Sequence, residues 1–168
     1  MPSRTRTSRP GFSLLEACAV VCVVGIVLAT FLPTFLRKVR ASKSVEAAER
    51  LGELHQGTAA YFASRRCLPE GAGPSPDHPS EEPVVVDFQG SPVWRAVGFV
   101  PSEPLRFRYS FRPEQTGCNL HGLRLVTLRA EGDLDADGVL STFERSAGAN
   151  RHGELVPVGT LRVVRETE

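Results

Sequence analysis

The chain has 168 residues and a formal net charge of +1. Its length is sufficient for a membrane anchor and one modest globular domain. Because the net charge is close to zero, bulk electrostatics give no reason to expect nucleic acid as a partner. The arginines are plentiful but scattered along the sequence, which indicates ordinary solvated faces.

An apolar run extends from Phe12 to Leu36, and it is long enough to cross a bilayer as one helix, which needs about 20 residues. A carboxylate, Glu16, lies near its start. A lone charge in hydrocarbon costs roughly 2.5–3.5 kcal/mol on insertion scales, so this group requires a partner. A secretory signal peptide would have a shorter apolar stretch that ends in a cleavage site of small residues. A plain single-pass anchor is the second alternative, and it has no need of Glu16.

The residues around the start of this run closely resemble the class III signal sequence of type IV pilins and their relatives. A short basic leader ends in Gly11, Phe12 follows it, and Glu16 lies four residues further on. The resemblance implies that prepilin peptidase removes residues 1–11 by cutting between Gly11 and Phe12, and that the new amine is methylated. It also implies that Phe12 and Glu16 serve assembly, with the Glu16 carboxylate pairing with the Phe12 amine of a neighbouring subunit or of its own chain.

Basic residues flank both ends of the apolar run, residues 12–36, so the count of positive charges does not select an orientation. The resemblance implies that the leader lies in the cytoplasm and that the run is a transmembrane and assembly helix. The chain is therefore expected to be a single-pass protein of the bacterial inner membrane, with its C-terminal domain in the periplasm. Once assembled, it would form part of a cell-surface filament.

The helix is expected to continue through residues 37–66 as an amphipathic segment. Apolar side chains recur there at steps of three and four, while charged side chains occupy the other faces. The stripe consists of Ala47, Leu51, Leu54, Thr58 and Tyr61/Phe62. No proline falls between Pro33 and Pro69, so nothing forces the helix to end earlier. The stripe is predicted to pack against the globular domain.

The globular domain is expected over residues 67–168. It begins with a loop, residues 68–83, whose proline, glycine, serine and acidic residues indicate an irregular connector. Apolar runs and period-two alternation then predict strands. The candidate strands are residues 84–88, 105–111, 123–130 and 161–164, and Trp94 is expected in the core. These patterns predict an α+β fold in which a long N-terminal helix packs on an antiparallel β-sheet, the layout of the type IV pilin fold.

The four cysteines divide by location. Cys18 and Cys22 lie one helical turn apart in the apolar run, where they are expected to act as small apolar residues. Cys67 and Cys118 fall in the part that the pilin resemblance places outside the cytoplasm, where disulfides persist. One intramolecular bridge, Cys67–Cys118, is therefore expected.

An acidic stretch, residues 133–144, fits the D-x-D-x-D-G-x5-E pattern of EF-hand calcium loops at every position. Alternate oxygens in a tight turn point at one centre, Gly138 allows the sharp bend, and Leu140 is expected to pack inward. The candidate calcium ligands are Asp133, Asp135, Asp137, Val139 through its carbonyl, Ser141 and Glu144. Because helices are not expected on both sides, the loop would lie on a β scaffold and the ion would be structural. The alternative is an acidic surface turn without calcium.

The sequence contains no recognisable catalytic motif, and its four histidines are scattered without zinc-ligand spacing, so the chain is not expected to be an enzyme. Three functions stay open. They are a major or minor subunit of a type IV pilus-like filament, a pseudopilin of a type II secretion system, and a membrane-anchored calcium-dependent binding module that does not polymerise. Glu16 favours assembly, and the lack of the Asp-Pro-Trp-Gly motif of major pseudopilins favours the pilus. The expected partners are other pilin-like subunits, prepilin peptidase and the inner membrane.

Overall fold

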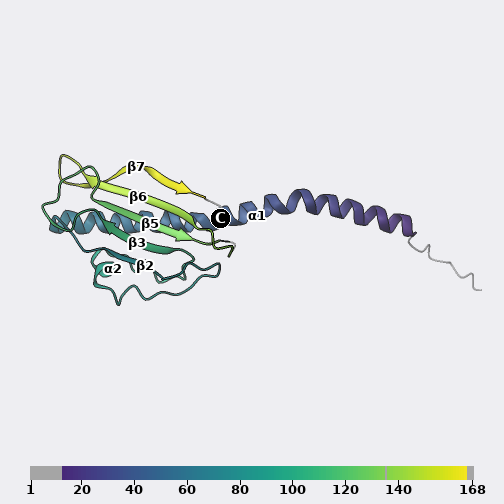
Figure 1. Ribbon diagram of the computed structural model, residues 1–168, viewed down its shortest axis with the longest axis horizontal. Coiled ribbons are helices and arrows are strands. Elements are labelled where there is room, and N and C mark those ends of the chain that lie inside the picture. The colour runs from purple at the N-terminus through teal and green to yellow at the C-terminus, as the bar shows by residue number, and fades with distance from the viewer. Residues whose placement is uncertain (1–12, 135, 166–168) are drawn as a thin grey trace, which may run out of the picture. The chain divides into compact units, whose positions relative to one another are not determined.

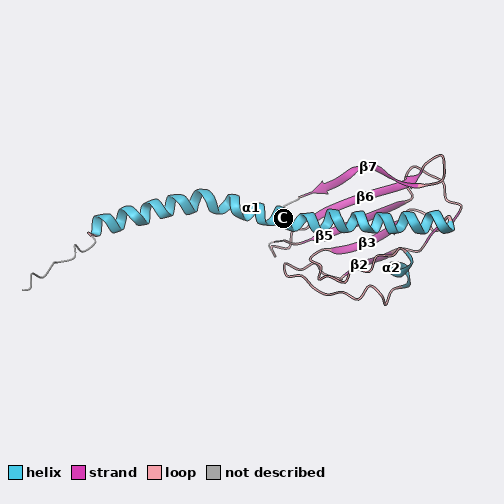
Figure 2. Cartoon of the chain, turned by 180° about the vertical axis from the view of Figure 1, so that it is seen from behind, coloured by secondary structure: helices cyan, strands magenta, loops and turns pink. Residues whose placement is uncertain are grey.

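The computed structural model describes residues 13–134 and 136–165. The chain divides into two compact units, Met1–Lys38 and Val39–Glu168, and one helix, α1 (Leu14–Arg65), runs through both (Figure 1, Figure 2). This helix confirms the predicted long N-terminal helix. The remaining elements are β1 (Cys67–Leu68), β2 (Ala72–Ser75), α2 (Pro92–Ala96), β3 (Arg108–Pro113), β4 (Gly117–Cys118), β5 (Val126–Gly132), β6 (Ser141–Ala149) and β7 (Leu155–Val164).

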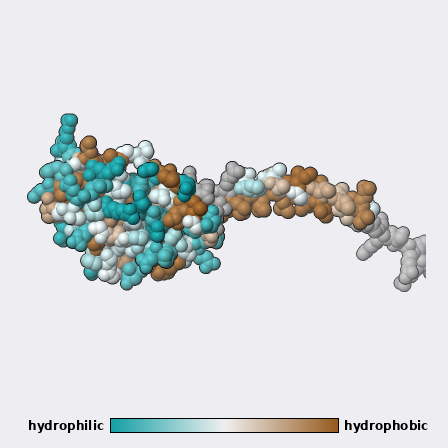
Figure 3. All heavy atoms as spheres, viewed as in Figure 1, coloured by the Kyte–Doolittle hydropathy of each residue, from teal (hydrophilic) through white to brown (hydrophobic). Residues whose placement is uncertain are grey.

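The segment Leu14–Leu36 of α1 is long and apolar enough to cross a membrane. All of its side chains are exposed to solvent, including Leu14 at 84% and Phe31 at 70%. Pro33 lies inside the helix, which continues beyond it. Figure 3 shows the surface of this segment as mostly hydrophobic. Exposed apolar surfaces of this extent are typical of segments that contact lipid or other protein.

The second unit is built on a five-stranded antiparallel sheet with the strand order β2-β3-β5-β6-β7. β1 and β4 form a separate two-stranded sheet. The C-terminal half of α1 lies across one face of the larger sheet, as the two opposite views show (Figure 1, Figure 2). The predicted α+β arrangement of a long helix and an antiparallel sheet is therefore confirmed.

The hydrophobic core lies between α1 and this sheet. The predicted stripe of α1 is buried from Ala47 to Thr58, and Phe62, rather than the partly exposed Tyr61, ends it. The Thr58 hydroxyl donates a hydrogen bond of 2.6 Å to the carbonyl of Leu54, so this buried polar group is satisfied within the helix. Alternate residues of β3 and β5 supply the other side of the core. They are Tyr109, Phe111, Val126, Leu128 and Ala130.

Trp94 of α2 is buried, as predicted, in an aromatic cluster with Phe88 and Phe99. The ring centroids of Trp94 lie 5.4 Å from Phe88 and 5.5 Å from Phe99. Next to this cluster, α1 approaches the residue that follows α2 so closely that a Cβ on Gly57 would lie 1.9 Å from the carbonyl oxygen of Val97. A glycine at this position therefore lets two backbone segments touch.

Four elements differ from the sequence-based expectations. The range 84–88 forms only an isolated bridge, between Val84 and Leu105, and Val85 is 73% exposed. The range 68–83, expected as irregular, contains β2, which pairs with β3. All of β6 lies outside the predicted strands, and the acidic loop pattern extends over its first four residues. β7 begins six residues before the predicted strand 161–164. Long-range pairing, which local pattern does not encode, explains these differences.

Candidate functional site

Glu16 and Ser13 form a capping box at the N-terminus of α1. The Oε2 atom of Glu16 accepts hydrogen bonds from the backbone N–H and from the hydroxyl of Ser13, both of 2.9 Å. In return, the Ser13 hydroxyl oxygen accepts a bond of 3.2 Å from the backbone N–H of Glu16. This arrangement satisfies N–H groups that the first helical turn leaves unpaired. The Ser-x-x-Glu spacing is visible in the sequence, and it gives Glu16 a role in the helix besides the predicted pairing with an amine.

The predicted processing site, Gly11 and Phe12, lies outside the described residues, as does the rest of the leader. Further along the apolar segment, the Thr30 hydroxyl donates bonds of 3.0 Å to the carbonyls three and four residues earlier. Cys18 and Cys22 carry exposed thiols that are not bridged. Glu16 and Thr30 bond within the helix but stay exposed, and most of the other side chains of the segment are apolar.

The acidic loop connects β5 to β6. Oδ2 of Asp133 accepts a hydrogen bond of 3.0 Å from the N–H of Gly138, and Oδ1 of Asp137 accepts one of 2.7 Å from the N–H of Val139. These bonds close the turn around Gly138, whose φ of +85° favours glycine. The second oxygen of Asp133, Oδ1, is buried and has no hydrogen-bond partner within residues 13–134 and 136–165. A buried carboxylate oxygen without a donor is suited to a cation.

Glu144 lies apart from this turn, as the fourth residue of β6. Its carboxylate accepts a hydrogen bond of 2.8 Å from Nε of Arg129 and lies 3.5 Å from Arg162. Ser141, the first residue of β6, is fully buried. Asp135 lies outside the described residues, and among those that are described no three His, Cys, Asp or Glu side chains form a group that could hold a metal ion. The structure thus brings Asp133, Asp137 and Val139 together, and it holds Glu144 on the sheet.

The acidic loop also contacts α1. Nζ of Lys43 donates a hydrogen bond of 3.3 Å to the carbonyl of Leu134 and lies 3.6 Å from the carboxylate of Glu81. Leu134 is 1% exposed, so it packs inward, whereas Leu140, expected to do so, is only partly buried. The loop is therefore fixed to the domain by one apolar side chain and one ammonium group.

The predicted disulfide between Cys67 and Cys118 is present. The two cysteines face each other in the register of β1 and β4. α1 ends at Arg65, so the bridge ties the C-terminal end of the long helix to a segment 51 residues further along the chain. The N–H of Asn119 adds a hydrogen bond of 2.8 Å to the carbonyl of Arg66 at the same place. This end of the helix is therefore anchored to the domain covalently.

His55 is a half-buried imidazole on α1. Its Nε2 atom is buried and has no hydrogen-bond partner among the described residues. Burial, and to a smaller degree the charge of Arg145, lower the pKa of His55 below its ordinary value. The folded domain therefore favours the neutral imidazole. His55 is a packing residue, and its protonation at low pH lowers the stability of the fold.

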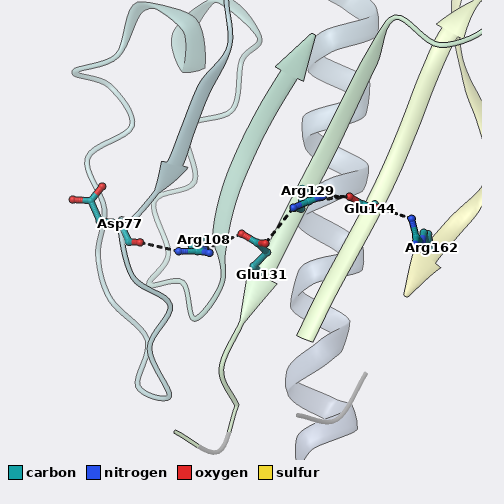
Figure 4. A network of polar contacts seen from close by, with 6 residues as sticks. All are labelled: Asp77, Arg108, Arg129, Glu131, Glu144 and Arg162. Carbon is teal, nitrogen blue, oxygen red and sulfur yellow. Dashed lines mark hydrogen bonds and ion pairs between the residues drawn. The ribbon is translucent and has the colours of Figure 1, made fainter. Parts of the chain in front are cut away.

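A ladder of ion pairs crosses the sheet on the face opposite α1 (Figure 4). Nε of Arg108 donates a hydrogen bond of 2.9 Å to Glu131, and Arg129 bonds both Glu131 and Glu144. The antiparallel register places Arg108 opposite Glu131 and Arg129 opposite Glu144. From edge to edge, the members are the Asp77 carbonyl, Arg108, Glu131, Arg129, Glu144 and Arg162. The sequence does not reveal this ladder, because its residues come from four strands and a loop.

Comparisons with models of known protein families, with curated proteins and with solved structures found no match for this chain. Its function is therefore argued from the residues and their arrangement.

Proposed function

We propose that the chain is a structural subunit, a major or minor pilin, of a type IV pilus-like filament. Prepilin peptidase would remove residues 1–11, and the mature protein would assemble through its hydrophobic N-terminal helix. One observation carries this proposal. An exposed apolar span, Leu14–Leu36, has a glutamate in its first turn and continues without a break into a helix half that packs on an antiparallel sheet.

Under this proposal Glu16 caps the helix and pairs with an amine, and the free-energy costs of losing these two interactions differ. Loss of a helix cap costs typically about 1 kcal/mol. Loss of one partner from a buried ion pair costs about 3–5 kcal/mol, because the other charge stays buried without compensation. In a filament core made of packed helices, the pair between Glu16 and the amine of a neighbouring Phe12 would be a buried ion pair. Assembly is therefore expected to depend on the charge of Glu16 far more than on its cap.

Two matched variants separate these roles. Glu16→Gln keeps a side chain that serves in a capping box but removes the charge, whereas Ser13→Ala removes the cap and keeps the charge. When each is expressed with prepilin peptidase and the assembly machinery, both are expected to be cleaved. Intact-mass analysis of membrane extracts should then show the loss of residues 1–11.

Filament formation is expected from Ser13→Ala but not from Glu16→Gln, as measured by electron microscopy of sheared surface fractions. Normal filaments from Glu16→Gln would contradict the assembly role of the charge. A mature wild-type protein that still begins at Met1 would contradict the pilin function itself.

We further propose calcium as a structural ion of the acidic loop. Oδ1 of Asp133, which has no hydrogen-bond partner among the described residues, supports it, and Asp137 and the Val139 carbonyl lie in the same turn. Asp135 stays a predicted ligand from the sequence pattern. Glu144 is excluded from this proposed set, because two arginines bond its carboxylate on the sheet. Outside the cytoplasm a dissociation constant of about 10⁻⁴–10⁻³ M would be sufficient. When bound, the ion would neutralise the aspartates and fix the connection between β5 and β6.

A further inference from the structure

A groove of about 500 Å³ lies on the face of the five-stranded sheet that α1 leaves uncovered. Arginines dominate its charged side chains. The charged groups that line it are Arg112, Arg124, Arg129, Arg162, Glu114 and Glu144. Four guanidinium groups thus face two carboxylates, an excess of two positive charges. The volume falls within the range of small-ligand sites, about 300–1,000 Å³.

The groove owes its concave shape to an irregularity in β7. Glu144 pairs with Arg162, but two residues further along β6 Ser146 pairs with Val158, so β7 carries extra residues at this point. Bulges of this kind bend a strand away from a flat sheet. Gly159, with a φ of +74°, lies in the extra segment, and a Cβ there would meet no atom of the described chain within 4 Å. The bulge therefore opens a hollow between β7 and the neighbouring strands.

The arginines of the groove differ in what already binds them. Arg129 and Arg162 share the carboxylate of Glu144. The side chain of Arg129 is 29% exposed, whereas that of Arg162 is 73% exposed and lies 3.5 Å from Glu144. Arg112 and Arg124 have no ion pair or side-chain hydrogen bond with any residue in 13–134 or 136–165. Two arginines thus lie beside a carboxylate, and two keep their donors available.

We propose that this groove is a binding site for an oxyanion group, a phosphate or a carboxylate carried by a multiply charged ligand. A guanidinium group presents a planar fork of donors that matches the oxygens of either group in a bidentate manner. Arg112 and Arg124 supply the direct contacts. Arg129 and Arg162, which lie beside Glu144, add positive charge to the groove. None of the lining residues belongs to the apolar segment, so this proposal can be tested independently of filament assembly.

The test is isothermal titration calorimetry of the full-length chain in a neutral detergent, at constant ionic strength. Sodium pyrophosphate and sodium citrate serve as probes, so that phosphate and carboxylate chemistry are measured separately. Saturable binding at millimolar concentrations or below is expected for at least one of them. Arg112→Gln combined with Arg124→Gln should weaken it at least about tenfold, which corresponds to about 1.4 kcal/mol. Because neither side chain is ion-paired with a described residue, the double variant is expected to fold as the wild type does.

The matched control removes the same charge elsewhere, through Arg95→Gln combined with Arg151→Gln, two exposed positions outside the groove. It should change the affinity less than about twofold, a difference of about 0.4 kcal/mol. Ser146→Glu keeps every arginine but places a carboxylate in the groove, and it should abolish binding. The proposal is overturned if neither probe binds saturably, if the control pair weakens binding as much as the groove pair, or if Ser146→Glu binds as tightly as the wild type.

Discussion

Replacement of Gly57 by alanine is expected to destabilise the domain, although alanine is the better helix former. A Cβ at this position would lie 1.9 Å from the carbonyl oxygen of Val97 and 3.0 Å from its carbonyl carbon. Both are backbone atoms, so neither can rotate away as the end of a side chain could. α1 and the segment after α2 would have to separate, which loosens the aromatic cluster around Trp94.

The magnitude follows from two opposing effects. Overpacking costs about 1–3 kcal/mol, and a rigid backbone contact belongs in the upper part of that range. Alanine in a helix interior regains up to about 1 kcal/mol relative to glycine. The net loss for Gly57→Ala is therefore about 1–2 kcal/mol, which lowers the thermal midpoint by about 4–8 °C.

Gly52 provides the control in the same helix. A Cβ there would meet no atom of the described chain within 4 Å. Gly52→Ala therefore gains only helix propensity, and it should raise the midpoint by about 2–4 °C. Both variants are compared in thermal unfolding of the full-length chain in neutral detergent. The fluorescence of Trp94, the one tryptophan of the sequence, follows the loss of the core. An unchanged or raised midpoint for Gly57→Ala would refute the backbone contact between α1 and Val97.

Reduction of the Cys67–Cys118 bridge, which closes a loop of 51 residues, should lower the free energy of unfolding by about 4 kcal/mol, as measured by denaturant titration with and without reductant. Acidification below about pH 6.5 should destabilise the domain, because the lowered pKa of His55 lets the unfolded chain bind this proton more readily than the folded one. His55→Gln should flatten that part of the stability–pH profile, and an unchanged slope would assign it to other groups. Millimolar calcium should raise the thermal midpoint. Asp133→Ala should abolish this rise whereas Glu144→Gln should retain it, and the reverse pattern would restore Glu144 to the ligand set.

Local pattern was sufficient for the parts of this protein in which neighbours along the chain are also neighbours in space. α1 could be predicted from the apolar span and from the stripe between Ala47 and Phe62, because residues three and four apart share one helix face. The alternation from Leu105 to Phe111 likewise identified a buried face, since period two is intrinsic to extended backbone. The Ser-x-x-Glu spacing of the Ser13–Glu16 capping box is likewise a local pattern that the sequence shows.

Apart from the Cys67–Cys118 bridge, tertiary structure alone decided which distant residues meet. The sequence pattern placed Glu144 at the end of a calcium loop, but the pairing of β5 with β6 sets it opposite Arg129 on the sheet. The arginines look scattered along the chain, and only the register of the strands and the bulge in β7 gather four of them around one groove. Strand register depends on pairing between segments far apart in sequence, and a shift of one residue would turn every side chain to the opposite face. The sequence thus contains the arginines of the groove, whereas the pairing of the strands determines where they gather and what shape the groove has.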